Sequence, residues 1–454
     1  DIHAAFRHIR SGYRLFTGRR RFFHYLMHLY VDKNRQNKIN KYDKSTELFQ
    51  RAAKVIPSGL YGHQGPAEGC CIPVSAYPLF SQKAKGSYFW DVDGNKFIDY
   101  MCAYGPNVLG YNDPDVDAAA LAQAKIENCV TAPSTKIIEF AECLVDTVAS
   151  ADWAFFAKNG NDVTTAAIMT ARAATHRKKI IFVNGFYHGV APWCQKVDYP
   201  GVLPEDVANN LYVDWNDFEG LKRVVEENEG EIAAFISTPY LHGNFIDNVL
   251  PAEGYWQKVR KLCTEKGIVL IIDDVRAGFR LDIAGSDHFY GFEADLICFC
   301  KALANGWNVS ALCGKEWLKS AISGLSYTGS YWMSAIPFAA GLACIEKMKK
   351  LDTPKMFREN GLKLTNGLKA AAENNGFHLS VSGEPALFYL MLKDDDSLML
   401  HQEWIAEIVK RGVFMTNHHN HFMNASLTDE DIKQTIDVAE EAFHVLRKNP
   451  PELG

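Results

Sequence analysis

The sequence predicts an α/β fold in which a mostly parallel sheet forms a large domain, with a smaller α+β domain beside it. From about residue 112 to residue 348, short apolar runs alternate with helical patterns. The apolar runs are nearly continuous, which is typical of parallel strands covered by helices on both faces. After about residue 351, helical patterns mix with short strands, which indicates the smaller domain.

Five apolar runs are expected to be strands of the large domain. They are WAFFAK at 153–158, KIIFVN at 179–184, AAFIST at 233–238, IVLIID at 268–273 and DLICFC at 295–300. The periodicity between them predicts helices at about 163–174 and at 255–266. Ahead of this region, the segment 87–101 (SYFWDVDGNKFIDYM) places an Asp-Gly pair between two strand-like runs, which predicts a hairpin.

The composition is that of a soluble globular protein with two lobes, since the 454 residues are 47% apolar and 22% charged. No apolar run approaches the roughly 20 residues that span a bilayer, and no secretory signal pattern is present. A cytoplasmic location is therefore expected. The first residue is Asp1 rather than Met, so we expect a chain that was processed or cut from a longer protein with an upstream domain.

The first 45 residues are strongly basic, with 11 Lys or Arg against three Asp or Glu, whereas the remainder has 37 against 51. Within them, the segment 14–30 (RLFTGRRRFFHYLMHLY) mixes arginine with aromatic residues, as surfaces that bind membranes or nucleic acids do. A helical extension docked on an acidic body or a partner subunit explains the apolar spacing as well, and we favour it. We expect no nucleic-acid partner and no membrane partner.

Polar or aromatic residues follow four of the expected strands, at the sheet edge where α/β proteins bind ligands. In chain order they are Asn159, Gly160 and Asn161, then Tyr187 and His188, then Asp273, and last Lys301. The Asn-Gly-Asn turn opens a helix whose free N–H groups suit a phosphate, although such turns are common. An aromatic side chain can stack on a planar ring, although a half-buried core tyrosine is the plainer alternative.

The buried charges of an aspartate and a lysine at one edge are costly unless something pairs with them. A phosphate cradle, a stacking aromatic, a carboxylate and a lysine together are what pyridoxal 5′-phosphate requires. The lysine would form a Schiff base with the aldehyde. The carboxylate would keep the ring nitrogen protonated, so that the ring can take up electrons.

The sequence resembles the class III aminotransferases of the type I pyridoxal-phosphate fold, over about residues 54–445. The matching motifs are VIPSG at 55–59, KGSYFWDVDGNKFIDYMCAYGPNVLGY at 85–111, FYHG at 186–189, LIIDDVRAGFR at 270–280 and SLTDEDI at 426–432. They are most similar to the branch that contains glutamate-1-semialdehyde aminomutase. The resemblance implies a seven-stranded, mostly parallel sheet. It divides the chain into three units. Residues 1–45 are a basic extension, residues 46–111 and 351–454 form the small domain, and residues 112–350 form the large domain.

The resemblance implies that Lys301, Asp273 and Tyr187 are the catalytic residues. The implied cofactor-binding residues are Asn159, Gly160, Asn161, Tyr187, His188, Asp273, Val275, Lys301, Gly329 and Ser330. Val275 and Tyr187 would pack on opposite faces of the ring. Gly329-Ser330 falls where the family has Gly-Thr, whose hydroxyl reaches the phosphate of the neighbouring subunit. A homodimer with shared active sites is therefore implied. Arg276 replaces an uncharged residue of the relatives and is expected near the ring hydroxyl.

Two departures concern the substrate. The segment 57–69 (PSGLYGHQGPAEG) has no arginine where the aminomutase holds a carboxylate, and the segment 413–427 (VFMTNHHNHFMNASL) lacks the arginine of many class III enzymes. We therefore expect an amine or amino-acid donor and an aldehyde or ketone acceptor with apolar substituents. Tyr61, Tyr104 and Trp332 are the candidate pocket walls. A natural-product pathway, such as the one supplying the alkyl pyrrole of prodigiosin, is one candidate setting. An aminomutase, which is an isomerase, is the alternative.

Three histidines, His418, His419 and His421, lie close together near the C-terminal end. Three imidazoles could bind a metal, but no carboxylate or cysteine completes an obvious set. A plain loop or a pocket lining is favoured, and no metal is expected.

Overall fold

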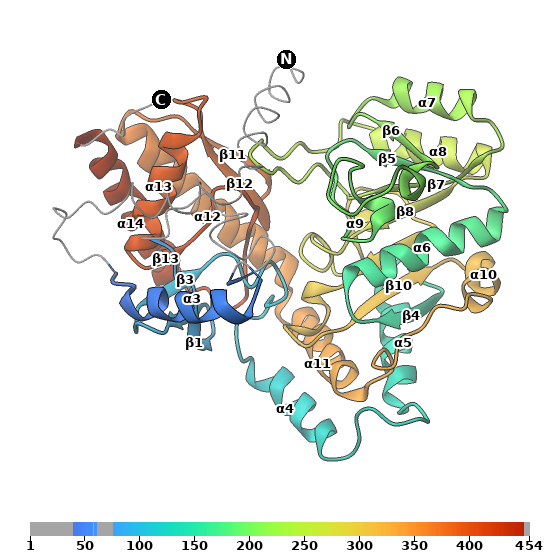
Figure 1. The fold of residues 1–454 in the computed structure, drawn as a ribbon, viewed down its shortest axis with the longest axis horizontal. Helices are drawn as coiled ribbons and strands as arrows, with labels where there is room; N and C mark the ends of the chain where they lie inside the picture. Colours follow the sequence, from blue (N-terminus) through green and yellow to red (C-terminus); the bar gives the residue numbers. More distant parts are fainter. Residues whose placement is uncertain (1–39, 58, 61–75, 449–454) are drawn as a thin grey trace.

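The computed structural model describes residues 40–57, 59–60 and 76–448. Most of the basic extension and the candidate pocket residue Tyr61 therefore lie outside the described residues. Figure 1 shows two bodies side by side, one built on the large sheet and the other on the two ends of the chain. None of the helices in the described ranges is long and apolar enough to cross a membrane.

The large sheet has seven strands and is mostly parallel, as predicted. Its order is β4 (Trp153–Ala157), β10 (Ser310–Gly314), β9 (Leu296–Phe299), β8 (Val269–Asp273), β7 (Ile232–Ser237), β5 (Lys179–Val183) and β6 (Asn210–Val213). Only β10 runs antiparallel to its neighbours, β4 and β9. The strands β7, β8 and β10 are buried at every position, which explains their unbroken apolar sequences.

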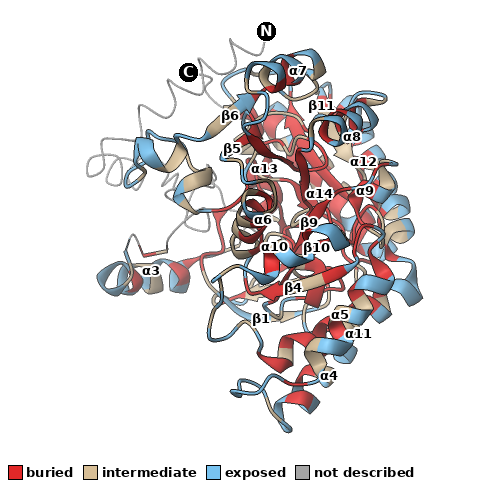
Figure 2. Ribbon diagram, turned by 90° about the vertical axis from the view of Figure 1, so that its right-hand side faces the viewer, coloured by how far each residue is buried: buried red, intermediate tan, exposed pale blue. Residues whose placement is uncertain are grey.

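Helices cover both faces of this sheet (Figure 1). The helices of this body are α4 (Pro114–Ala124), α5 (Lys136–Thr147), α6 (Gly160–Thr175), α7 (Phe218–Glu227), α8 (Tyr255–Lys266), α9 (Ser286–Phe289), α10 (Lys319–Ser323) and α11 (Ala335–Leu351). Of these, α4 packs mainly against α11 and not on the sheet (Figure 1). Helix α6 begins three residues earlier than the periodicity predicted. Asp162 accepts from the backbone N–H of Asn159 at 2.8 Å and so caps the helix start. Figure 2 shows the buried residues concentrated between these layers.

The second body joins the two ends of the chain. Strands β1 (Ser81–Lys85), β2 (Tyr88–Asp91) and β3 (Lys96–Asp99) pair with β13 (Val413–Phe414), and β11 (Leu379–Glu384), β12 (Leu387–Leu392) and β14 (His421–Phe422) form a smaller sheet. The antiparallel pair β2–β3 confirms the predicted hairpin. The helices are α3 (Asp43–Val55), α12 (Thr353–Asn374), α13 (Met399–Lys410) and α14 (Asp429–Lys448). The domain boundaries given above remain predictions.

Candidate active site

The two residues that open the question of a ligand, Asp273 and Lys301, lie at the carboxyl ends of neighbouring strands of the sheet. Strands β8 and β9 are parallel, and Asp273 pairs in register with Cys298. Lys301 follows three residues later and begins the short helix η5 (Lys301–Ala304). The sheet topology thus brings the predicted carboxylate and the predicted lysine to the same edge.

The adjacent acids Asp273 and Asp274 serve different neighbours. Asp273 Oδ2 lies 2.8 Å from His188 Nδ1, and its Oδ1 accepts from the backbone N–H of Val275 at 3.2 Å. Asp274 accepts from the backbone N–H and the hydroxyl of Ser286, at 2.9 and 2.5 Å. Burial raises the pKa of Asp274 to about 7. Asp274 therefore stabilises the turn after β8 through Ser286. Asp273 is instead oriented by His188, which lies in the loop after β5.

Lys301 has the properties of a reactive amine. Its backbone is left-handed, with φ of 44°, and the residue is partly buried. Burial, followed by the positive charge of Arg276, lowers the pKa of its amine to about 7. A substantial fraction of this amine is therefore neutral near pH 7, as a nucleophile requires.

The start of helix α6 leaves no room for a side chain at Gly160. A Cβ there would lie 2.9 Å from Val275 Cγ1. Asp162 already accepts from the N–H groups of Lys158 and Asn159, at 3.2 and 2.8 Å. The following N–H groups at the positive end of the helix are the ones suited to an anion.

Asn161 is tied to the segment after β5 through its side-chain oxygen. Asn161 Oδ1 accepts from the backbone N–H groups of Val190 and Ala191, at 2.8 and 2.9 Å. A Cβ on Gly189 would lie 2.2 Å from the same oxygen. This contact orients Asn161, so its amide N–H group is the part that could donate to a phosphate.

Tyr187 and His188 lie in the loop after β5. The ring of His188 is buried against Asp273, and its carbonyl oxygen accepts from Thr164 on α6 at 2.8 Å. Tyr187 is 57% exposed, and burial of its hydroxyl raises the pKa, with Arg276 and Asp273 among the charges that act on it. The structure therefore gathers both residues at the edge that carries Asp273.

Gly329 and Ser330 lie in the segment between α10 and α11. Ser330 is exposed, and its carbonyl oxygen accepts from Cys129 Sγ at 3.5 Å. A Cβ on Gly329 would collide with Trp332, whose ring packs edge-on against Phe155 at 5.9 Å. The role of Trp332 as a pocket wall and the role of Ser330 in a partner's site stay predictions.

Two further residues border the site from the second body. His419 lies edge-on to Tyr104, with ring centroids 5.2 Å apart, and burial together with Arg276 and Lys301 holds its pKa well below its usual value. Within the described ranges, no group of three or more His, Cys, Asp or Glu could hold a metal ion. The contact with Tyr104 and the effect of Arg276 and Lys301 place His419 near the lysine, and the role of Tyr104 as a pocket wall stays a prediction.

Arg280 is a residue that the sequence reasoning missed. Its guanidinium is fully buried, donates to the carbonyl oxygen of Gly105 and lies over the ring of Phe422 at 4.9 Å. Burial lowers its pKa to about 10. A Cβ on Gly105 would lie 3.3 Å from Lys301 Cδ, so Arg280 holds a backbone segment that presses on the lysine. An arginine inside an otherwise apolar turn, AGFRL, was the available signal.

These residues fit pyridoxal phosphate. The crowded Gly160 turn leaves N–H groups for a phosphate, Lys301 supplies an amine with a lowered pKa, and Asp273 is held by His188, whose Nε2 is buried without a partner among the described residues. These groups complement a pyridine that carries an aldehyde and a phosphate arm.

Comparisons with known proteins agree with a pyridoxal-phosphate site. The family model for "Aminotransferase class-III" matches residues 72–443. The aminopentol aminotransferase of Sphingopyxis macrogoltabida is 36% identical, with 89% of this chain and 95% of the relative covered. The 3-aminobutyryl-CoA aminotransferase of Cloacimonas acidaminovorans is 30% identical, with 90% and 98% covered. The FumI protein of Sphingopyxis sp. MTA144, solved in a pyridoxal-phosphate form, superimposes with a TM-score of 0.87 at 36% identity, with 91% and 98% covered.

The predicted nearer resemblance to the aminomutase is not supported by these findings. A glutamate-1-semialdehyde aminomutase from Pseudomonas aeruginosa PAO1 is 18% identical with a TM-score of 0.76, and it covers 88% of this chain and 94% of its own. At that identity the likeness shows the fold alone. The class itself is confirmed. The chain belongs to the class III aminotransferases, enzymes of the type I fold whose cofactor is pyridoxal phosphate.

Proposed function

We propose that the protein transfers an amino group between an amine on a largely apolar carbon skeleton and a carbonyl compound, with Lys301 as its catalytic lysine. One observation carries the assignment of the lysine. Lys301 stands at the carboxyl edge beside Asp273, and burial and Arg276 lower the pKa of its amine to about 7. The name of one relative, aminopentol aminotransferase, supports an amine as the substrate, and the apolar character of the skeleton is inferred from the missing arginines alone.

The chain's own residues would divide the work as follows. Lys301 would carry the cofactor and then move a proton to and from the reacting carbon as a general base and acid. Asp273, fixed by His188 at 2.8 Å, would hold a proton on the pyridine nitrogen. When bound, the cofactor supplies an aldehyde and an electron-withdrawing ring. Tyr187 and Val275 would pack on the two faces of the ring.

The phosphate would be held by the N–H groups at the start of α6, with Asn161 as a side-chain donor. Ser330 would complete this cradle in the neighbouring subunit, which makes the enzyme a homodimer with shared sites. Its exposure, on a segment that also exposes Tyr331 by 70% and Met333 by 42%, supports a partner there.

The natural-product setting remains a prediction, as does the aminomutase alternative. An aminomutase keeps its amino group within one molecule. A separate amino donor would therefore not be needed, whereas the proposed transferase stalls without one. Steady-state turnover measured with and without a donor distinguishes the two.

The assignment of Lys301 is tested by borohydride reduction of the holoenzyme, followed by peptide mapping. The label should lie on Lys301, and Lys301→Ala should bind the cofactor without covalent attachment and lose turnover. The amine of Lys158 donates to Ser334 at 2.7 Å and should carry no label in the wild type. Lys158→Met is therefore the matched control, and it should keep the label on Lys301. A label on any other lysine would overturn the assignment.

A further inference from the structure

Arg276 is a cation at the site without a carboxylate partner among the described residues. It lies in the turn after β8, three residues beyond Asp273, and is half-buried. Its Nη1 donates to Asn420 Oδ1 at 3.2 Å, and this partner is a neutral amide. The carboxylate of Asp273 is already engaged by His188 and by the N–H of Val275. A guanidinium has five donors, so most of its binding capacity remains.

The residue that holds Arg276 is itself fixed. Asn420 is fully buried, and its Nδ2 donates to Asn248 Oδ1 at 2.8 Å. Asn248 Oδ1 also accepts from the backbone N–H of Gly243 at 2.6 Å, so it must face the donor side of Asn420. The amide oxygen of Asn420 is therefore turned toward Arg276. Because Asn248 fixes Asn420, Asn420 in turn orients the guanidinium of Arg276 before any ligand binds. This lowers the entropy cost of binding.

Arg276 also lies close enough to the reactive lysine for its charge to act on the amine. Burial is the largest cause of the lowered pKa of Lys301, and the positive charge of Arg276 is the second largest. Both charges and burial hold the pKa of His242 well below its usual value. The two ring nitrogens of His242 are buried without a hydrogen-bond partner among the described residues. A neutral imidazole N–H without a partner and a guanidinium bonded only to a neutral amide therefore lie within electrostatic range of each other. Both are donors suited to a small anion.

The other cations near this edge are less accessible to a ligand. Lys158 donates to Ser334. Arg280 keeps two guanidinium nitrogens without a partner among the described residues, but it is fully buried against Gly105 and Phe422. Lys301 is the catalytic amine in the proposed function. An anionic group that enters beside Lys301 would therefore meet Arg276. An unpaired carboxylate in a site of low polarity is costly. The presence of Arg276 therefore determines whether a carboxylate-bearing substrate can bind.

On the basis of the proposed function, we infer that Arg276 binds the carboxylate of an α-amino acid and its α-keto acid, the small couple that exchanges amino groups with the apolar amine. The keto acid gives its oxygen and receives the amino group, and the larger partner does the reverse. Arginine was expected at two other places in the sequence and was absent from both. The turn after β8 supplies it instead.

The test separates charge recognition from cofactor function. Arg276→Gln and Arg276→Lys are compared with the wild type, using pyruvate and its neutral isostere pyruvamide as acceptors. The amino form of each enzyme is prepared with a primary amine. Its return to the starting absorbance is then followed against acceptor concentration. Arg276→Gln should raise the apparent KM for pyruvate roughly tenfold to a hundredfold and leave pyruvamide nearly unchanged, with partial recovery in Arg276→Lys.

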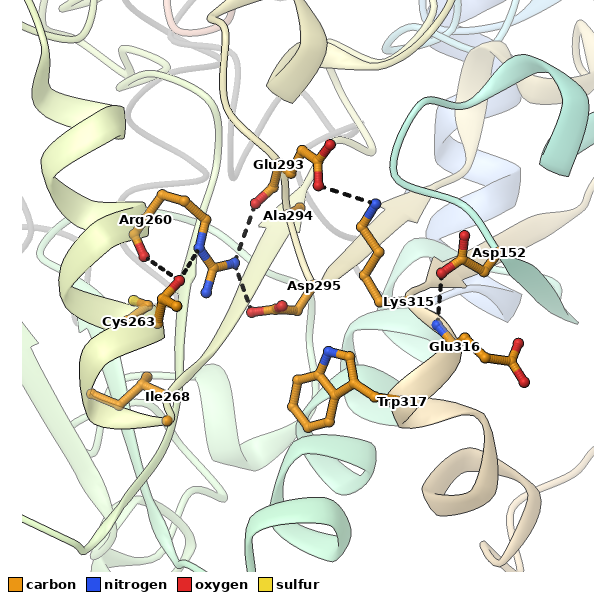
Figure 3. A pocket seen from close by; sticks show the side chains of 12 residues that line it. Asp152, Arg260, Cys263, Ile268, Glu293, Ala294, Asp295, Lys315, Glu316 and Trp317 are labelled. Carbon is orange, nitrogen blue, oxygen red and sulfur yellow. Dashed lines mark hydrogen bonds and ion pairs between the residues drawn. The ribbon is translucent and has the colours of Figure 1, made fainter.

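A matched control uses an arginine that already has its carboxylate. Arg260 donates to Asp295 at 2.8 Å in a surface hollow of about 740 Å³ at the amino ends of the strands (Figure 3). Arg260→Gln should leave both acceptors as in the wild type. Propionate, which cannot react, should compete with pyruvate in the wild type and lose this competition in Arg276→Gln.

The outcomes are distinct. A similar loss for pyruvate and pyruvamide in Arg276→Gln would show that Arg276 serves the cofactor or the lysine, and it would overturn the inference. Equal use of both acceptors by the wild type would also overturn it. Failure of the wild-type holoenzyme to exchange amino groups between any amine and any carbonyl compound would instead refute the proposed function, before Arg276 is examined.

Discussion

At the scale of single residues, two neighbouring aspartates show how position decides chemistry. Asp273 ends strand β8 and faces His188, whereas Asp274 turns the other way and accepts two hydrogen bonds from Ser286. The sequence indicated Asp273 because side chains at the end of a parallel strand reach the ligand edge. The partner of each acid depends on segments 12 and 85 residues away in the chain, which no local pattern contains.

This contrast gives a paired prediction. Asp273→Asn should keep the thermal midpoint near that of the wild type but lower kcat by at least about a hundredfold, because an amide cannot hold a proton on the pyridine nitrogen. Asp274→Asn should have the opposite profile. It should lower the thermal midpoint by a few degrees, since one contact with Ser286 is lost, and change kcat little. Differential scanning calorimetry and initial rates measure the two effects.

A near-normal rate in Asp273→Asn would mean that this carboxylate does not touch the cofactor. A large loss of rate in a fully stable Asp274→Asn would show that the two acids had been assigned the wrong way round.

Arginine residues mark the limit of residue-scale reasoning. Arg276 and Arg280 stand four positions apart in one motif, yet one remains half-buried at the site and the other is fully buried behind it. This difference in burial depends on contacts with Gly105, Asn420 and Phe422, which are all distant in sequence. From the sequence, Arg276 was expected near the ring hydroxyl, and a carboxylate-binding arginine was expected only in the segments 57–69 and 413–427, which lack one.

At the scale of elements, the start of helix α6 shows what a pattern could and could not provide. The sequence predicted a phosphate site there from the Asn-Gly-Asn turn, but it placed the helix start at residue 163 instead of Gly160. Strands β6 and β10 were not picked out, because β6 (NLYV) is mostly half-buried or exposed and offers no long apolar run, and β10 (SALCG) is made of small residues apart from Leu312. Strand β10 is recognisable only from its pairing with β4 and β9.

The close packing at Gly160 predicts a defect that a second change repairs. Gly160→Ala places a methyl group 2.9 Å from Val275 Cγ1, so the helix start or Val275 must move away from the phosphate and the ring. We expect the Kd of the cofactor-free protein for pyridoxal phosphate to rise about tenfold, the effect of weakening one charge-assisted hydrogen bond. The double variant Gly160→Ala, Val275→Ala should regain most of this affinity. Absorbance titration gives the Kd values.

Gly324→Ala is the control, because the nearest atoms to its new methyl group lie 3.6 Å away and the affinity should not change. If Gly160→Ala binds the cofactor like the wild type, the α6 turn does not hold the phosphate.

At the scale of the whole molecule, the site is assembled from both bodies. Strand β13 pairs with β3 through Val413 and Ile98, and the N–H of Phe422 donates to the carbonyl oxygen of Tyr100 at 2.8 Å. These contacts join segments more than 300 residues apart and bring Tyr104 and His419 to the edge that carries Lys301. The fold class followed from alternating strands and helices. This closure of the two ends rested on family resemblance alone, because strand pairing at such separation leaves no periodic signal.

The shared-site dimer is the prediction that belongs to this scale. Ser330→Ala removes one donor to a charged phosphate and should weaken cofactor affinity roughly tenfold to a hundredfold. In a mixed dimer of Ser330→Ala and Lys301→Ala chains, shared sites would place both defects in one site and leave the other site wild type. Titration of purified mixed dimers should then find one tight, competent site per dimer. If each chain builds its own site, every site carries one defect, and only weakened competent sites appear. That result would exclude Ser330 from the partner's phosphate cradle, because a hydroxyl acting within its own chain leaves no intact site in the mixture.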